Sequence, residues 1–189
     1  MDSLYDTVPR ETRVTMVIRR KHIVADVEKL LAENNIHTPP VPVEEVAKRC
    51  GIQIRYERLE SDLSGFVTGP EHGAIIGVNT AHPVVRRRFT IAHELGHFRL
   101  HRDAKLHVDR GFLMKRSALS SQGTDEDEIE ANLYAAELLM PRSMLSTDPD
   151  IVEGIDVTDE KVIGILARRY LVSAQALVIR LLNLGLIDQ

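Results

Sequence analysis

Residues 93 to 97 read His-Glu-Leu-Gly-His, and these residue types at this spacing can bind a metal ion and activate water. Side chains four apart on an α-helix lie on one face, so His93 and His97 can bind the same ion. Neutral imidazole is a favoured ligand of Zn²⁺. Glu94, beside the first histidine, can accept a proton from water whose pKa the ion lowers toward about 7. The motif predicts metal-assisted hydrolysis, with Glu94 as the general base.

A helix is needed to position this motif, and the surrounding residues predict one. Pro83 is typical of a first helical turn, and apolar residues follow at helical spacing to about Arg102. Gly96 inside this helix costs about 1 kcal/mol relative to alanine, so we expect another element to approach closely there. The alternative is that the two histidines merely form hydrogen bonds on a half-buried helix.

A catalytic zinc site also needs a third protein ligand and an open fourth position. His101 continues the spacing, but one further turn of a straight helix carries it about 6 Å past the ion. Residues 124–141 predict a second helix, with Thr124 as N-cap and early acidic residues that suit the helix dipole. Glu130 and Glu137 lie deeper, among alanines and leucines, where an unpaired carboxylate is costly. One of these two is expected to face the metal.

Two blocks of sequence carry a family resemblance. The first is Arg88-Phe89-Thr90-Ile91-Ala92-His93-Glu94-Leu95-Gly96-His97 with Leu100-His101, and the second is Glu130-Ala131-Asn132-Leu133-Tyr134-Ala135-Ala136-Glu137-Leu138-Leu139-Met140-Pro141. In this order they resemble the ImmA/IrrE metallopeptidase family, over about residues 20 to 185. The resemblance implies that Glu130, which opens the Glu-Ala-Asn segment, is the third ligand. It also implies an endopeptidase that cleaves a specific protein, typically a DNA-binding repressor of the helix-turn-helix type in a mobile element or stress response.

The order of predicted elements indicates an α+β fold, mostly helical with a small three-stranded sheet and C-terminal helices, and the family resemblance implies that this domain is zincin-like. Residues 1–19 lack a pattern and are expected to form a flexible extension, whereas 20–189 form a single metallopeptidase domain that includes a C-terminal helix pair. Strands are predicted at residues 52–59, 64–68 and 74–78, with a further one near 111–114.

The middle strand offers a way to hold a substrate. A peptide that adds to an open sheet edge gains backbone hydrogen bonds with little demand on its sequence. From the resemblance to zincin-like peptidases, Gly65, Phe66 and Val67 are the predicted substrate strand. The alternative is that residues 103–123 cover this edge.

Three further side chains are candidates for stabilising the transition state or orienting a ligand. Tyr134 lies four residues after Glu130 and shares its helical face, although packing of the ring in the core is the alternative. His101 and His107 could donate a hydrogen bond or support a metal ligand.

Composition limits the compartment and the metal. The 189 residues are 43% hydrophobic, and Cys50 is the only cysteine, which excludes an internal disulfide and a cysteine-based zinc site. No secretory signal or long apolar stretch is apparent, so we expect a cytoplasmic protein that makes no membrane contact. Zinc is the expected metal, although manganese or iron also suits two histidines and a carboxylate.

The C-terminal helix pair raises a different function. Residues 163–170 and 174–182 read as two helices with a tight turn, as in DNA-binding helix-turn-helix units. The second helix is strongly apolar, and the net charge of −4 gives no general attraction to nucleic acid, so we expect packing and no direct DNA binding. A further alternative is a non-cleaving regulatory module that sequesters a repressor or toxin.

Overall fold

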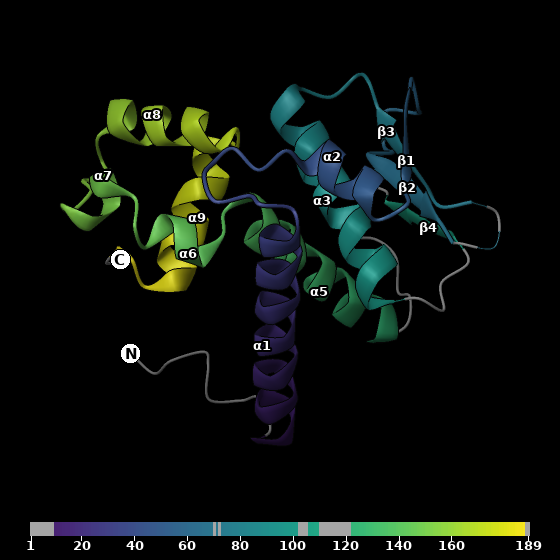
Figure 1. Ribbon diagram of the computed structural model, residues 1–189, viewed down its shortest axis with the longest axis horizontal. Helices are drawn as coiled ribbons and strands as arrows, with labels where there is room; N and C mark the ends of the chain where they lie inside the picture. The colour runs from purple at the N-terminus through teal and green to yellow at the C-terminus, as the bar shows by residue number, and fades with distance from the viewer. Residues whose placement is uncertain (1–9, 70, 72, 102–105, 110–121, 188–189) are drawn as a thin grey trace.

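The computed structural model describes residues 10–69, 71, 73–101, 106–109 and 122–187. Within these residues, helices and strands occur largely in separate runs and the strands form one sheet, which confirms the predicted α+β class (Figure 1). The helices are α1 (Arg10–Glu33), α2 (Val43–Arg49), α3 (Val84–Leu100), α5 (Gln122–Leu139), α6 (Arg142–Leu145), α7 (Pro149–Val152), α8 (Glu160–Tyr170) and α9 (Ala174–Leu184). The strands are β1 (Gln53–Glu57), β2 (Gly65–Thr68), β3 (Ile75–Asn79) and β4 (Leu106–Asp109).

Within the described residues the sheet has four strands in the order β1-β3-β2-β4, where three were expected. β1 runs parallel to β3, and β2 runs antiparallel to both β3 and β4. The extra strand, β4, follows α3, and its four alternating residues are too few to predict a strand from sequence. The strand expected near residues 111–114 lies outside the described residues.

β2 therefore does not provide the open edge that was expected at Gly65, Phe66 and Val67. Its two sides are already hydrogen-bonded, one to β3 and the other to β4. Gly65 instead lies against α3, since a Cβ there would come 2.5 Å from Cγ2 of Thr90. The absent side chain lets the sheet rest directly on the helix that carries the histidines.

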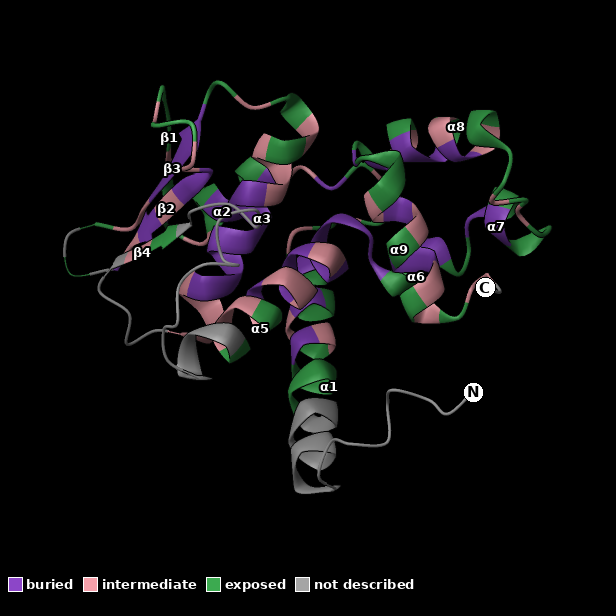
Figure 2. Ribbon diagram, turned by 180° about the vertical axis from the view of Figure 1, so that it is seen from behind, coloured by how far each residue is buried: buried purple, intermediate pink, exposed green. Residues whose placement is uncertain are grey.

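α1 begins at Arg10, ten residues before its apolar pattern starts, so residues 10–19 are helical where a flexible extension was expected. From Ile23 onward α1 contributes to a core cluster that extends through the sheet and α3 to Leu181 of α9. Figure 2 shows this buried surface along the inner sides of the helices. Helices α6 to α9 gather on one side of α1 and α5, and the sheet lies on the other (Figure 1).

α8 and α9 pack against the rest of the chain. α9 buries Leu177 and Leu181, and its Arg180 forms a buried ion pair with Glu137 of α5. Nε of Arg180 also donates to the carbonyl of Met140. Within the described residues, no single helix is long and apolar enough to cross a membrane; α8 and α9 meet that test only as a pair bent by 92°.

α3 and α5 lie closely side by side at Gly96. A Cβ at this position would come 3.0 Å from Cβ of Tyr134 and 3.2 Å from Cα of Ala131. The expected reason for a glycine inside α3 is therefore present, namely the close approach of a second helix. This approach brings the polar side chains of α5 against the histidines of α3.

Candidate metal centre

His93 and His97 lie on one face of α3 and are each 3% exposed. Their Nε2 atoms are 3.1 Å apart. Two imidazole nitrogens bound to one tetrahedral zinc ion lie about 3.3 Å apart, given zinc–nitrogen distances of about 2.0–2.1 Å. The spacing of the two nitrogens therefore fits a shared metal ion.

Glu128 of α5 supplies a carboxylate to the same place. Its Oε2 lies 3.5 Å from Nε2 of His93, and its Oε1 lies 3.7 Å from Nε2 of His97. Two imidazoles and one carboxylate form a donor set that suits a catalytic zinc ion. The buried group of His93, His97 and Glu128 can therefore bind a metal.

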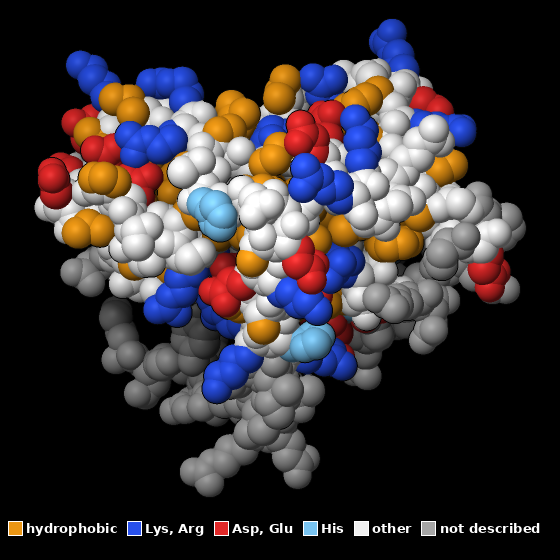
Figure 3. All heavy atoms as spheres, in the orientation of Figure 1, with side chains coloured by type: hydrophobic (Ala, Val, Ile, Leu, Met, Phe, Trp, Pro, Cys, Tyr) orange, Lys and Arg blue, Asp and Glu red, His pale blue; other side chains and the backbone are white. Residues whose placement is uncertain are grey.

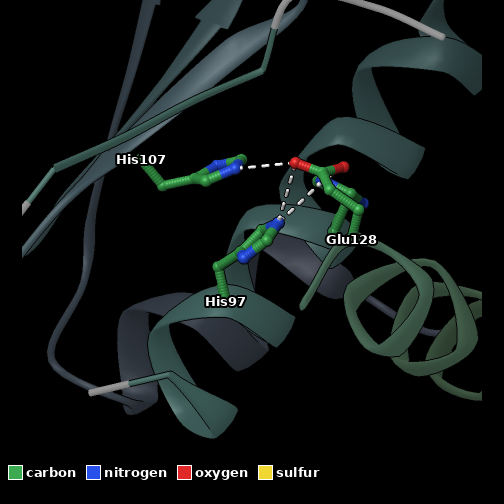
Figure 4. Close-up of side chains that lie close together, drawn as sticks. His97, His107 and Glu128 are labelled. Atoms are coloured by element: carbon green, nitrogen blue, oxygen red, sulfur yellow. Dashed lines mark hydrogen bonds and ion pairs between the residues drawn. The ribbon is translucent and has the colours of Figure 1, made fainter. Parts of the chain in front are cut away.

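His107 reaches this group from the sheet. Figure 4 shows His107 of β4, His97 of α3 and Glu128 of α5 pointing toward one another. Nε2 of His107 lies 2.8 Å from Oε1 of Glu128, and its ring stacks on that of His97 with centroids 3.6 Å apart. One donor atom from each of these residues and from His93 lies within 4.8 Å of the others.

Glu94 lies beside the histidines, as the motif predicts, and is fully buried. Its Oε2 lies 3.2 Å from Nδ1 of His107. A buried carboxylate next to the metal-binding group is placed to accept a proton from water there.

Asn132 orients His93. Its Oδ1 lies 3.1 Å from Nδ1 of His93, where it can accept the ring N–H. Donation from Nδ1 leaves the lone pair on Nε2, the atom that faces His97 and Glu128. Glu128 and Asn132 are four residues apart, so one face of α5 supplies both the carboxylate and the orienting amide.

The two stacked histidines differ in protonation. Burial, together with the nearby His107 and His93, lowers the pKa of His97 to about 2, which keeps His97 in the neutral form that binds metals. Burial also opposes a charge on His107, but its hydrogen bonds with Glu128 and Glu94 outweigh this and raise its pKa to about 9. The two carboxylates therefore favour a positive charge between them, which a metal cation also satisfies.

Glu130, the third ligand implied by family resemblance, lies in a different group. Its Oε2 is 3.0 Å from Nε2 of His101, and its Oε1 is 3.2 Å from Nε of Arg19. Asp127 completes this outer group, with Oδ1 3.2 Å from Nε2 of His101. Residues two apart on a helix point about 200° apart, so Glu128 and Glu130 cannot both face the inner group.

The sequence contained a signal for Glu128. With Thr124 as the predicted N-cap, Glu128 counted among the early acidic residues, whose presence the helix dipole explains. α5 begins at Gln122 instead, so Glu128 lies in its second turn, where the dipole explains little. The spacing of four residues between Glu128 and Asn132 matches that between His93 and His97, and pairing these two spacings would have favoured Glu128.

The other candidates lie away from the metal-binding group. The Tyr134 hydroxyl donates to Oδ2 of Asp26, which also binds Arg99, and burial raises the pKa of Tyr134 well above its usual range. This is the core-packing alternative for that ring. Glu137, the second acid considered as a ligand, accepts from the backbone N–H of Arg142 and pairs with Arg180.

Known proteins resemble this chain in sequence and in fold. The IrrE N-terminal-like domain family, Peptidase_M78, matches residues 47–182, a range that contains both helices of the site. The chain belongs to the Peptidase_M78 family. An uncharacterized immunity region protein 2 of Bacillus phage phi105 is 30% identical over 124 residues, which cover 66% of this chain and 72% of that protein.

A solved structure shares the fold of this Peptidase_M78 member. A Mycobacterium tuberculosis transcriptional regulator superposes with a TM-score of 0.59 at 19% identity, over 90% of this chain. This chain spans half the length of that regulator. At this identity the likeness concerns the fold alone.

Proposed function

We propose that this protein is a zinc-dependent endopeptidase in which His93, His97 and Glu128 hold the metal. The observation that carries the proposal is the buried convergence of these three side chains in a Peptidase_M78 chain, with Glu94 beside them. We assign the third ligand to Glu128 and not to Glu130, because Glu130 lies with Arg19 and His101. When bound, zinc lowers the pKa of water and polarises the scissile carbonyl.

Glu94 has the role of general base in this proposal. Its carboxylate takes a proton from the attacking water and then passes it to the leaving amine of the cleaved peptide. Burial of Glu94 excludes competing solvent and strengthens its electrostatic influence. Asn132 contributes by fixing the ring orientation and tautomer of His93.

The proposed substrate is a specific intracellular protein, a DNA-binding repressor of the helix-turn-helix type. The name of the phage phi105 relative refers to an immunity region, and the structural neighbour is described as a transcriptional regulator. Both descriptions support a role in transcriptional control. The cytoplasm, where such a repressor acts, is the proposed location.

A trapping comparison tests this function. Tagged wild type and Glu94→Gln are incubated with a lysate of the native host, and bound proteins and new termini are identified by mass spectrometry. Glu94→Gln should retain its zinc and lose cleavage by about 10²- to 10⁴-fold, the usual contribution of a general base. It should therefore hold intact a protein that the wild type cuts at one bond.

The matched control is Glu33→Gln, which makes the same chemical change at an exposed glutamate of α1. This variant should cleave like the wild type. Full activity of Glu94→Gln would overturn the mechanism. A partner that both proteins bind equally and leave uncut would instead favour a non-cleaving module that sequesters a repressor or toxin.

A further inference from the structure

A fourth possible metal ligand, His107, lies beside the three proposed ligands. His107 belongs to the same group as His93, His97 and Glu128, in which one donor atom of each residue lies within 4.8 Å of the others. A set of three imidazoles and one carboxylate is enough to fill the tetrahedral coordination of zinc. A catalytic zinc ion, by contrast, keeps one position open.

The position of His107 in the sheet follows from strand alternation. His107 pairs with Val67 of β2, which is 5% exposed, so both side chains lie on the face of the sheet that packs on the helices. Its neighbour Val108 pairs with Phe66 and is 42% exposed. The register of β4 therefore directs the imidazole into the metal-binding group.

The other ring nitrogen of His107 is engaged by the proposed base. Nδ1 lies 3.2 Å from Oε2 of Glu94. Ligand histidines commonly donate the second ring N–H to a carboxylate, which raises their basicity and fixes their orientation. In this arrangement Oε2 of Glu94 supports His107.

We propose that His107 is a fourth protein ligand that closes the metal site and holds Glu94, so that hydrolysis requires β4 to withdraw this histidine. The proposal rests on the proposed function and adds a closed state to it. β4 is suited to such a movement, because within the described residues it is four residues long and pairs with one neighbour, β2, at the end of the sheet order. Short elements with few backbone hydrogen bonds lie at the low-stability end of a structure.

The first test counts ligands in the zinc-loaded full chain. X-ray absorption at the zinc edge should show three imidazoles in the wild type and two in His107→Ala. Zinc affinity, measured by competition with a chelator, should fall by more than about tenfold in this variant, since it loses a direct ligand. Val108→Ala is the matched control for damage to β4, and it should keep three imidazoles and the wild-type affinity.

The second test probes closure with acetohydroxamate, which binds open zinc sites through two oxygens. Cobalt is substituted for zinc so that binding can be followed in the visible spectrum. Acetohydroxamate should bind His107→Ala at least about tenfold more tightly than wild type or Val108→Ala. His107→Gln, which keeps a polar side chain, guards against misfolding of the alanine variant and should also bind it more tightly.

The outcomes separate this proposal from the one on which it rests. Two imidazoles in the wild type, or equal hydroxamate binding by wild type and both His107 variants, would overturn the closing role and leave the peptidase proposal intact. Unchanged zinc binding with loss of cleavage in His107→Ala would also overturn it, since His107 would then act on the substrate. A wild type that takes up no zinc would refute both.

Discussion

α3 and α5 carry two histidine–carboxylate groups side by side, and the pair differ in burial and in counter-charge. The inner group places Glu128, whose side chain is 15% exposed, against the histidines of the motif, which are 3–4% exposed. The outer group contains Asp127, which is 49% exposed, and Glu130, which faces a guanidinium from Arg19. The same residue types on the same two helices thus meet different environments.

The imidazole of His97 lies between the two groups. Nε2 of His97 faces the inner group, and its Nδ1 lies 3.3 Å from Nδ1 of His101 in the outer group. A carboxylate held by a guanidinium has less to gain from a cation than one placed against imidazoles. Residue types and spacing thus indicate where a metal site can form, whereas burial and local charge select the ligands.

The largest expected effect comes from removing the carboxylate of Glu128, compared with removing that of Glu130. Glu128→Ala should weaken zinc binding by more than about 100-fold, above the range for loss of a residue that only orients a ligand. Glu130→Ala should change zinc affinity by less than about threefold, because it removes a side chain outside the inner group. Both affinities are measured by chelator competition on the full chain.

The reverse result would restore the ligand implied by family resemblance. If Glu130→Ala loses zinc and Glu128→Ala retains it, the inner group is not the metal site. The pair serves as its own control, since both variants remove one carboxylate from the same helix two residues apart.

A smaller effect is expected from the amide that orients His93. Asn132→Ala should weaken zinc binding by about 10- to 100-fold, since Oδ1 no longer accepts the N–H of the His93 ring. Asn132→Asp keeps an acceptor at this position and should recover most of the affinity. Equal loss in both variants would show that the hydrogen bond is not what matters at this position.

The close approach of α3 and α5 positions both groups and can be tested at Gly96. Gly96→Val should lower the free energy of unfolding by about 1–3 kcal/mol, because its Cβ would press on Tyr134 and Ala131. Gly164→Ala in α8 is the control, since a Cβ there meets only the end of a flexible arginine, 3.4 Å away. The control should gain about 0.5–1 kcal/mol, as alanine favours a helix interior, and chemical denaturation measures both. Unchanged stability of Gly96→Val would contradict the tight contact.

The sequence predicted much of the fold because local pattern determined it. Strands β1 to β3 and helix α3 agree with the predicted segments within a few residues, since alternation, Pro83 and the apolar spacing are local signals. β4 was missed because four residues carry too little pattern and depend on pairing with β2. α1 also takes in residues 10–19, which were expected to be flexible, since the apolar spacing starts only near residue 20.

The site was predictable where one helix sets the geometry and less so where several elements meet. His93, Glu94 and His97 share a single turn of helix, so their convergence follows from spacing alone. The choice between Glu128 and Glu130 depends on the rotation of α5 against α3, and Gly96 sets how closely the helices approach. The place of His107 depends on the register of β4 against β2, which local sequence does not encode.

The smallest effect on stability is expected from a substitution at Arg19. The zinc binding of this variant shows whether burial or counter-charge distinguishes the inner group from the outer group. Arg19→Ala removes ion pairs of a 46% exposed side chain with Glu126 and Glu130, so the free energy of unfolding should fall by less than about 1 kcal/mol. If burial separates the groups, this variant should still bind one zinc ion per chain, because Asp127 stays open to water. If counter-charge separates them, releasing Glu130 should create a second zinc site with His101, and equilibrium dialysis would then show two ions per chain.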